Sequence, residues 1–266
     1  MPVEEFSAMP IHPTAILEGD IRLPEDDSVE IGPYVVLRGT IVLGSRTRIE
    51  PHATVQGEVT MGEGNTIGHG AVIGGDPQDL SFDRATSSGV VIGSGNTFRE
   101  YATVHRSTKP GGRTVVGDGN FLMAGAHIGH DCVLGNRNVL ANNVLFGGHI
   151  QTGDDAFLGG GSVYHQFVRI GDRAMAQGNA GFSQDLPPFV IGHAINVITG
   201  LNVVGLRRAG VSAARRAALK RAFELVYLEK APMERIREAA QDPAWTDEAA
   251  IFLAFVAAPS RRGVCR

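Results

Sequence analysis

The chain has few cysteines and few aromatic side chains. Among its 266 residues, 2 are cysteines (Cys132 and Cys265) and 6% are Phe, Trp or Tyr, whereas 35 are glycines. With so few cysteines we expect no disulfide framework, and a reducing, cytoplasmic setting is the simplest interpretation. The scarcity of aromatic residues and the abundance of glycine favour a turn-rich repetitive fold over a globule with an aromatic core.

Long apolar runs and an excess of basic residues are missing as well. One of the longest apolar runs covers residues 251–258 (IFLAFVAA), which is too short to cross a bilayer. The first residues, MPVEE, are acidic and no apolar stretch follows them, so we expect neither a signal peptide nor a transmembrane segment. A formal net charge of −4 argues against general nucleic-acid binding.

An aliphatic residue recurs at every sixth position through most of the chain. This period is neither helical nor simply alternating, and glycine or another small residue often stands near the aliphatic one. Polar Thr152 interrupts the last run. The repeated positions are Ile31, Leu37, Leu43, Ile49, Val55, Met61, Ile67 and Ile73, then Ile92, Phe98 and Val104, then Val116, Leu122, Ile128, Leu134, Leu140, Phe146, Leu158, Tyr164, Ile170 and Ala176.

This hexapeptide pattern predicts a mainly β fold, a parallel β-helix. Each hexad forms one flat side of a triangular coil with the aliphatic side chain inside, so three hexads make a coil of about 18 residues. Residues one coil apart, such as Asp131 and His149, should therefore stack in neighbouring coils. Two interruptions, residues 74–89 and 105–113, should leave the prism as loops, which often carry function.

The sequence changes character after Phe182. Its spacing predicts helices over residues 213–229, from about 232 to 240 and over 246–257, with Ser212 as the N-cap of the first. We therefore expect two domains, a β-helix over residues 1–191 and a helical domain over residues 192–266. Residues 207–221 contain six Lys or Arg and no acidic residue, which suggests an acidic partner or a phosphate as ligand, with a solvated helix face as the alternative.

Five histidines gather between positions 105 and 165. His127 and His130 flank the inward position Ile128, so both should lie near a corner with their side chains outside the prism. Imidazole is the side chain best suited to general-base catalysis near neutral pH. A zinc site through His127, His130 and His165, as in hexapeptide-fold carbonic anhydrases, is an alternative, and solvated histidines at turns are another. The five are His105, His127, His130, His149 and His165.

Several short motifs resemble those of the acyl-[acyl-carrier-protein]–UDP-N-acetylglucosamine O-acyltransferases of lipid A biosynthesis (LpxA family). The similarity covers nearly the whole chain, and the histidine block, the QDL loop and the helical tail are together more specific than the hexads. The motifs are HPTA at 12–15, GDPQDL at 75–80, VHR at 104–106, AHIGHDC at 126–132, LANN at 140–143, HQF at 165–167, QDLPP at 184–188, GLRR at 205–208 and SRRG at 260–263.

The resemblance implies a left-handed β-helix that forms a homotrimer with active sites between subunits. It also implies transfer of a 3-hydroxyacyl chain from acyl carrier protein to the glucosamine 3-hydroxyl of UDP-N-acetylglucosamine, the first step of lipid A biosynthesis. We expect no cofactor and no metal. The acidic carrier protein would bind the basic residues of the helical domain.

Residue roles carry over by motif. The resemblance implies that His130 is the general base and that Asp131 assists it. Gly178 matches the position that limits acyl length, and its lack of a side chain predicts room for a long chain. For the substrates, the resemblance implies that Gln78, Asp79 and His127 hold the sugar, that His149, His165 and Gln166 line the path of the diphosphate and the acyl donor, and that Asn202 and Arg208 contact the uridine diphosphate.

The chain departs from the family pattern at three positions. Ser81 stands where relatives commonly have a lysine for the sugar, Val204 replaces an acidic residue near the uridine, and Ala209 replaces a second arginine. The alternatives left open are an N-acyltransferase acting on the 3-amino analogue of the sugar nucleotide, a coenzyme-A-dependent sugar O-acetyltransferase and an inactive binding scaffold.

Overall fold

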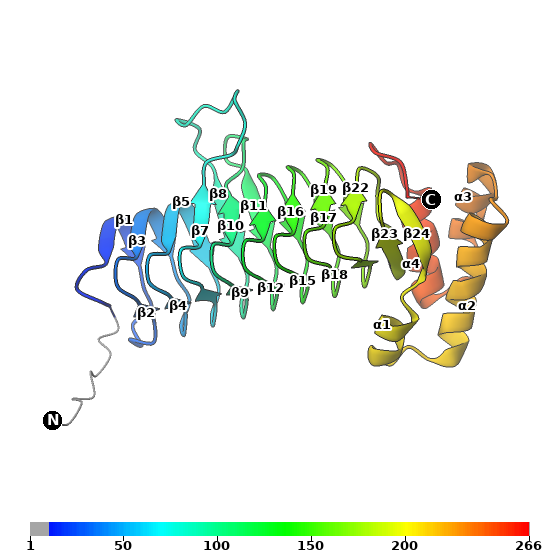
Figure 1. Ribbon diagram of the computed structural model, residues 1–266, viewed down its shortest axis with the longest axis horizontal. Helices are drawn as coiled ribbons and strands as arrows, with labels where there is room; N and C mark the ends of the chain where they lie inside the picture. The colour runs from blue at the N-terminus through cyan, green and yellow to red at the C-terminus, as the bar shows by residue number, and fades with distance from the viewer. Residues whose placement is uncertain (1–10, 266) are drawn as a thin grey trace. The chain divides into compact units, whose positions relative to one another are not determined.

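The computed structural model describes residues 11–265 and has two compact units, divided between Cys132 and Val133. Both units contain coils of short parallel strands, as the hexads predict (Figure 1). No helix among the described residues is long and apolar enough to cross a membrane.

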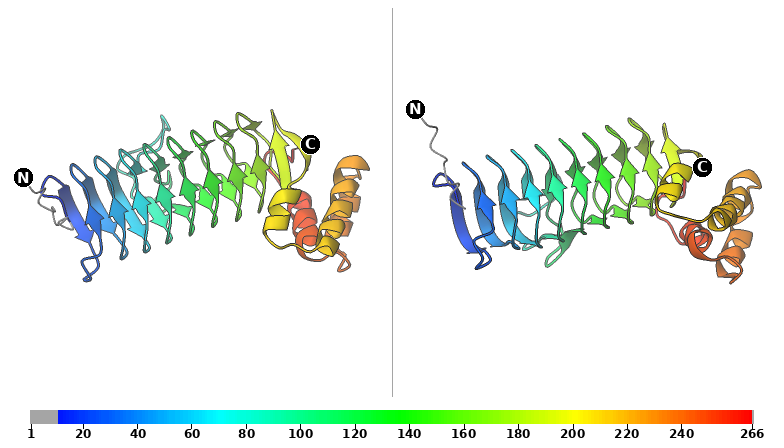
Figure 2. Two further views of the ribbon diagram at one scale, coloured as in Figure 1. Left: turned by 60° about the horizontal axis from the view of Figure 1, so that its bottom comes forward. Right: turned by 90° about the horizontal axis from the view of Figure 1, so that it is seen from below.

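The first unit begins with three strands long enough to continue around a corner: β1 (Ile16–Arg22), β3 (Val36–Val42) and β5 (Thr54–Met61). They lie side by side in Figure 2, coloured blue to cyan. The first half of β5 is followed by β7 (Val72–Gly75), β10 (Thr103–His105) and β13 (His127–Ile128), and its second half by β8 (Gly89–Ile92) and β11 (Arg113–Val116). A further face holds β2 (Glu30–Ile31), β4 (Arg48–Ile49), β6 (Thr66–Ile67), β9 (Thr97–Phe98) and β12 (Phe121–Leu122).

Glycine is required where these long strands turn. Gly19, Gly39 and Gly57 stack at one corner with φ angles of 105°, 119° and 82°. A Cβ on Gly19 would lie 2.3 Å from the carbonyl oxygen of Gly39, and one on Gly39 would lie 2.3 Å from that of Gly57. Both the backbone conformation and the close approach therefore exclude a side chain at this corner.

Both interruptions of the hexads are insertions into the first unit. Paired residues of regular coils, such as Val36 and Thr54, are 18 positions apart. Glu58 and Gly89 pair at a separation of 31, so the segment between β7 and β8 adds 13 residues, and it leaves the coils as a loop in Figure 1. Gly89 and Arg113 pair at a separation of 24, which adds one hexad and explains why the sixfold phase continues.

The second unit continues the coil architecture and ends in helices. Its coils contain β14 (Val133–Leu134), β17 (Gln151–Thr152) and β20 (Arg169–Ile170) on one face, β16 (Leu145–Phe146), β19 (Val163–Tyr164) and β22 (Gly181–Phe182) on another, and β15 (Val139–Leu140), β18 (Phe157–Leu158), β21 (Met175–Ala176) and β23 (Val190–His193) on the third. The last strand, β24 (Val197–Leu201), is antiparallel to β23.

The three predicted helices are present as α2 (Ala213–Phe223), which continues as the π-helical turn η1 (Glu224–Leu228), α3 (Met233–Gln241) and α4 (Asp247–Ala257). Ser212 is the N-cap of α2 and accepts a hydrogen bond from the Arg215 amide, as expected. The sequence pattern predicts only a connecting segment over residues 192–205, which is wrong, because β24 and the first half of α1 (Val203–Arg208) lie there. These elements are too short for a periodicity to reveal them.

The predicted inward positions form the core of both units. All the repeated aliphatic residues are between 0% and 3% exposed, and so are the small residues beside them, such as Ala53 and Ala174. Thr152 keeps its inward position in the stack between Leu134 and Ile170 and is 6% exposed. Its Oγ1 has no hydrogen-bond partner, so the one polar break in the pattern is also a polar atom left unsatisfied in the core.

Candidate active site

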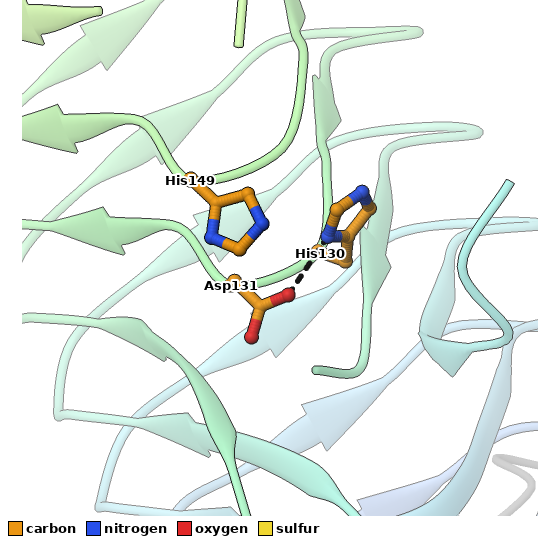
Figure 3. A group of neighbouring side chains, drawn as sticks. All are labelled: His130, Asp131 and His149. Carbon is orange, nitrogen blue, oxygen red and sulfur yellow. Dashed lines mark hydrogen bonds and ion pairs between the residues drawn. The ribbon is translucent and has the colours of Figure 1, made fainter. Parts of the chain in front are cut away.

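His130 and Asp131 stand at a corner that directly follows β13. Ile128 is buried in the prism, and Asp131 turns the corner with a φ of 60°. The side chains of His130 and Asp131 are only 12% and 7% exposed. Aspartate tolerates this left-handed conformation better than most residues. The Nδ1 of His130 lies 2.8 Å from Oδ2 of Asp131. Figure 3 marks this interaction with a dashed line. The two adjacent residues therefore form the hydrogen-bonded pair expected of a base and its orienting carboxylate.

The carboxylate of Asp131 receives hydrogen bonds from several other groups. The Ser107 hydroxyl donates to Oδ1, while the Thr108 hydroxyl and the Thr108 amide donate to Oδ2 at 2.7 and 3.2 Å. Burial alone would raise the pKa of Asp131, but the bonds from Ser107, Thr108 and His130 outweigh it and hold that pKa well below its usual range. Asp131 therefore stays ionised beside the imidazole.

His127 and His105 form a pair of neighbouring imidazole rings. Their ring centroids are 4.7 Å apart in an edge-to-face arrangement, and Nδ1 of His127 lies 2.7 Å from the Thr103 hydroxyl. Burial, followed by the nearby charges of His105 and His130, lowers the pKa of His127 to about 4. Burial also lowers the pKa of His105. His127 is therefore neutral near pH 7 and serves as a hydrogen-bonding group.

The loop between β7 and β8 carries Gln78 and Asp79, and both are exposed. The hydroxyl and the amide of Ser81 donate hydrogen bonds to Oδ1 of Asp79 at 2.7 and 2.8 Å. These bonds, with a smaller contribution from the charge of His130, lower the pKa of Asp79. The electrostatic interaction with His130 supports the expectation that this loop brings Asp79 toward the base.

In the second unit, His149 is part of a stack of rings. It turns a corner with a φ of 61°, and its ring lies parallel to that of Phe167 with centroids 4.6 Å apart. The guanidinium of Arg261 lies 4.8 Å from the centre of the Phe167 ring. Sequence reasoning missed this stack, since nothing in the pattern links residue 261 to residue 167. The predicted stacking of Asp131 with His149 joins the two units and stays a prediction.

The other predicted residues of the second unit are spread over several elements. His165 and Gln166 are exposed directly after β19, and Gly178 is exposed at a corner where an added Cβ would lie 3.2 Å from the carbonyl oxygen of Gly160. Arg208 is exposed in the last turn of α1. Asn202 caps α1 by accepting from the Gly205 amide at 3.0 Å, so it has a structural role whatever it binds.

Two family patterns match the chain. The pattern described as UDP N-acetylglucosamine O-acyltransferase, domain 2, matches residues 185–265, and the pattern of bacterial transferase hexapeptides matches residues 40–75 and 113–148. The acyl-[acyl-carrier-protein]–UDP-N-acetylglucosamine O-acyltransferase of Paraburkholderia phymatum is 43% identical over 262 residues, which cover 96% of this chain and 99% of the relative. The enzyme of the same name from Thermodesulfovibrio yellowstonii is 39% identical over 259 residues and covers the chain to the same extent.

Solved structures agree with the sequences. The UDP-N-acetylglucosamine acyltransferase of Arabidopsis superposes with a TM-score of 0.84 at 32% identity and covers 98% of this chain and 99% of its own. That of Francisella novicida superposes with a TM-score of 0.88 at 32% identity and covers 96% of this chain and 94% of its own. The coils are those of a left-handed parallel β-helix, and the chain belongs to the acyl-[acyl-carrier-protein]–UDP-N-acetylglucosamine O-acyltransferase family of acyltransferases.

Proposed function

We propose that the chain transfers a 3-hydroxyacyl group from acyl carrier protein to the glucosamine 3-hydroxyl of UDP-N-acetylglucosamine, with His130 as the general base. The observation that carries this proposal is the pairing of His130 Nδ1 with the ionised carboxylate of Asp131. A carboxylate can only accept, so Nδ1 carries the proton and donates. The basic lone pair of the imidazole is then on Nε2.

The reaction follows from this tautomer. Nε2 of His130 takes the proton of the sugar 3-hydroxyl while the oxygen attacks the thioester carbon, and a tetrahedral intermediate forms. When the carbon–sulfur bond breaks, the imidazolium returns the proton to the sulfur of the departing carrier. Asp131 stabilises the imidazolium during the interval. Proton transfer of this kind contributes about 10²–10⁴ in rate.

The surrounding residues provide binding. Neutral His127 and the loop residues Gln78 and Asp79 would hold the sugar through hydrogen bonds. Beyond them, His149, His165 and Gln166 would line the path of the diphosphate and the acyl donor, Asn202 and Arg208 would contact the uridine diphosphate, and Gly178 would leave room for a long acyl chain.

The acidic carrier protein would bind basic residues of the second unit. Among these, Arg215 is already paired with Glu248 at 2.7 Å, whereas Arg207 and Arg208 are both exposed in the last turn of α1. Since Arg208 is assigned to the uridine diphosphate, we expect Arg207 to contribute most to this docking. The proposal includes a cytoplasmic homotrimer with a β-helix domain at 1–191 and a helical domain at 192–266.

The 3-amino analogue of the sugar nucleotide is a second candidate acceptor. The observation that favours it is Ser81, which stands where relatives commonly have a lysine and which donates two hydrogen bonds to Asp79. The loop therefore presents a shielded carboxylate and no lysine ammonium to the sugar. An amine acceptor would give an amide product.

One assay tests these possibilities. The purified protein is incubated with UDP-N-acetylglucosamine or its 3-amino analogue and a panel of 3-hydroxyacyl carrier proteins, and the product masses are read. We expect His130→Ala to lower turnover by about 10² or more, while the control His12→Ala, outside the site, keeps it. Equal turnover of His130→Ala and wild type would refute the catalytic assignment, and acetyl transfer from acetyl-CoA alone would establish the acetyltransferase alternative. Stoichiometric zinc in metal analysis would support the zinc alternative.

A further inference from the structure

The three residues Arg106, Ser107 and Thr108 contact both the loop that carries Asp79 and the carboxylate that pairs with His130. They follow β10 directly and open the second insertion. Arg106 is 9% exposed and Ser107 is fully buried, which is unusual for an insertion that leaves a regular scaffold. Their side chains point to two different parts of the site.

Arg106 binds the loop of residues 76–88 at several points along its length. Its Nε lies 3.0 Å from Oδ1 of Asp76, where the loop begins, and its other nitrogens donate to the carbonyl oxygens of Arg84 and Thr86. The guanidinium also lies 4.8 Å from the centre of the Phe82 ring. One buried guanidinium therefore holds the shape of the loop that carries the exposed Asp79.

Ser107 and Thr108 bind the carboxylate of Asp131, whereas Arg106 binds the loop. The two hydroxyls hold one oxygen each, while His130 takes a second position on Oδ2. With every one of these donors in place, the carboxylate cannot rotate away from the imidazole without losing a hydrogen bond. The hydroxyls thus set the orientation of the His130–Asp131 pair.

The two sides are joined through the backbone. The hydroxyl of Ser88, at the end of the loop, donates to the carbonyl oxygen of Ser107, and Arg106 Nη1 lies 3.3 Å from the same hydroxyl. The Gly111 amide donates to the Ser87 carbonyl at 2.8 Å, which extends the contact between the two insertions. A displacement of either insertion would therefore reach the other.

We propose that Arg106, Ser107 and Thr108 are positioning residues that act as one clasp, fixing the substrate loop and the His130–Asp131 pair in a single arrangement. The proposal rests on the function proposed above, because the clasp positions that base and that loop. It assigns no direct contact with substrate to the three residues.

The two halves of the clasp have different kinetic signatures. In Arg106→Lys, a single ammonium replaces the guanidinium that bonds to Asp76, Arg84 and Thr86, so the loop should become more mobile. We therefore expect KM for the sugar nucleotide to rise about 10-fold with a smaller change in kcat. Thr108→Val removes the hydroxyl that donates to the Asp131 carboxylate. More of the negative charge of Asp131 then acts on His130, which favours the protonated imidazolium. The acidic limb of the kcat/KM profile should then move to higher pH, and Thr108→Ser should restore it. Lys109→Ala, an exposed neighbour, is the control and should change neither.

A second pair of measurements does not depend on turnover. Hydrogen exchange of residues 76–88 should quicken in Arg106→Lys, and NMR titration of the His130 ring should shift upward in Thr108→Val. If these changes occur while wild type transfers no acyl group to any acceptor, the proposed function fails and the clasp stands. The clasp is refuted if loop exchange and the His130 titration match those of wild type, or if activity falls only in proportion to a loss of folded protein.

Discussion

Neutral His127 should make the folding stability of the protein depend on pH. The pKa of His127 is lowered to about 4, chiefly by burial, whereas an unfolded chain has a histidine pKa near 6.5. Because the pKa is lower in the folded state, the contribution of His127 is complete above about pH 6.5 and is lost as the pH falls toward 4. A difference of about 2.5 units corresponds to a loss of about 3 kcal/mol in the free energy of unfolding.

The matched variant is His127→Gln, whose amide can still bond to the Thr103 hydroxyl. Equilibrium denaturation of both proteins at one fixed concentration, from pH 7.5 to 4.5, gives the difference directly. We expect wild type to lose about 2–3 kcal/mol more than His127→Gln over this range. Asp131 has a lowered pKa, so its own loss of stability comes below about pH 4 and does not overlap. Parallel curves for the two proteins would refute the reasoning.

Two further predictions concern Thr152 and Gly178. Thr152→Val removes the buried hydroxyl that lacks a partner and keeps the shape of the side chain, so we expect a gain of about 1–2 kcal/mol in the free energy of unfolding, read by denaturant titration. Thr152→Ser, which keeps the hydroxyl and loses a methyl group, should not gain stability, and an equal gain would contradict the explanation. Gly178→Met should shift the preferred acyl chain to a shorter length in the carrier-protein panel, with Gly178→Ala as the smaller change. An unchanged product pattern would show that the acyl chain does not reach this corner.

The sixfold period predicted much of the fold because it is imposed by packing. An inward position tolerates only an apolar or small side chain, so Leu122 and Ala174 each identify the inside of a coil. The His130–Asp131 pair could be predicted from the resemblance of its motif. Because the two residues are adjacent in the chain, their contact does not depend on how distant segments fold. The size of the second insertion, one hexad, kept the period intact.

The clasp could not be predicted in this way. Arg106, Ser107 and Thr108 obey no period, and their partners Asp76 and Asp131 are about 25–30 positions away in the chain. A loop takes its shape from the tertiary contacts that it happens to make, and local sequence does not encode those contacts. The short elements β24 and α1 were not predicted from the sequence, because they contain too few residues to show a periodicity.

Strand β1 has consequences for self-association. Among the described residues it pairs on one side only, with β3, and Leu17, in register with the buried Leu37, is 39% exposed. An open strand edge with apolar residues can recruit another chain and start a fibre. Glu18, Asp20 and Arg22 alternate along this edge, where Arg22 pairs with Asp20 and Arg38 of β3 pairs with Glu18. The charged side chains on β1 therefore disfavour the recruitment of another chain at this edge.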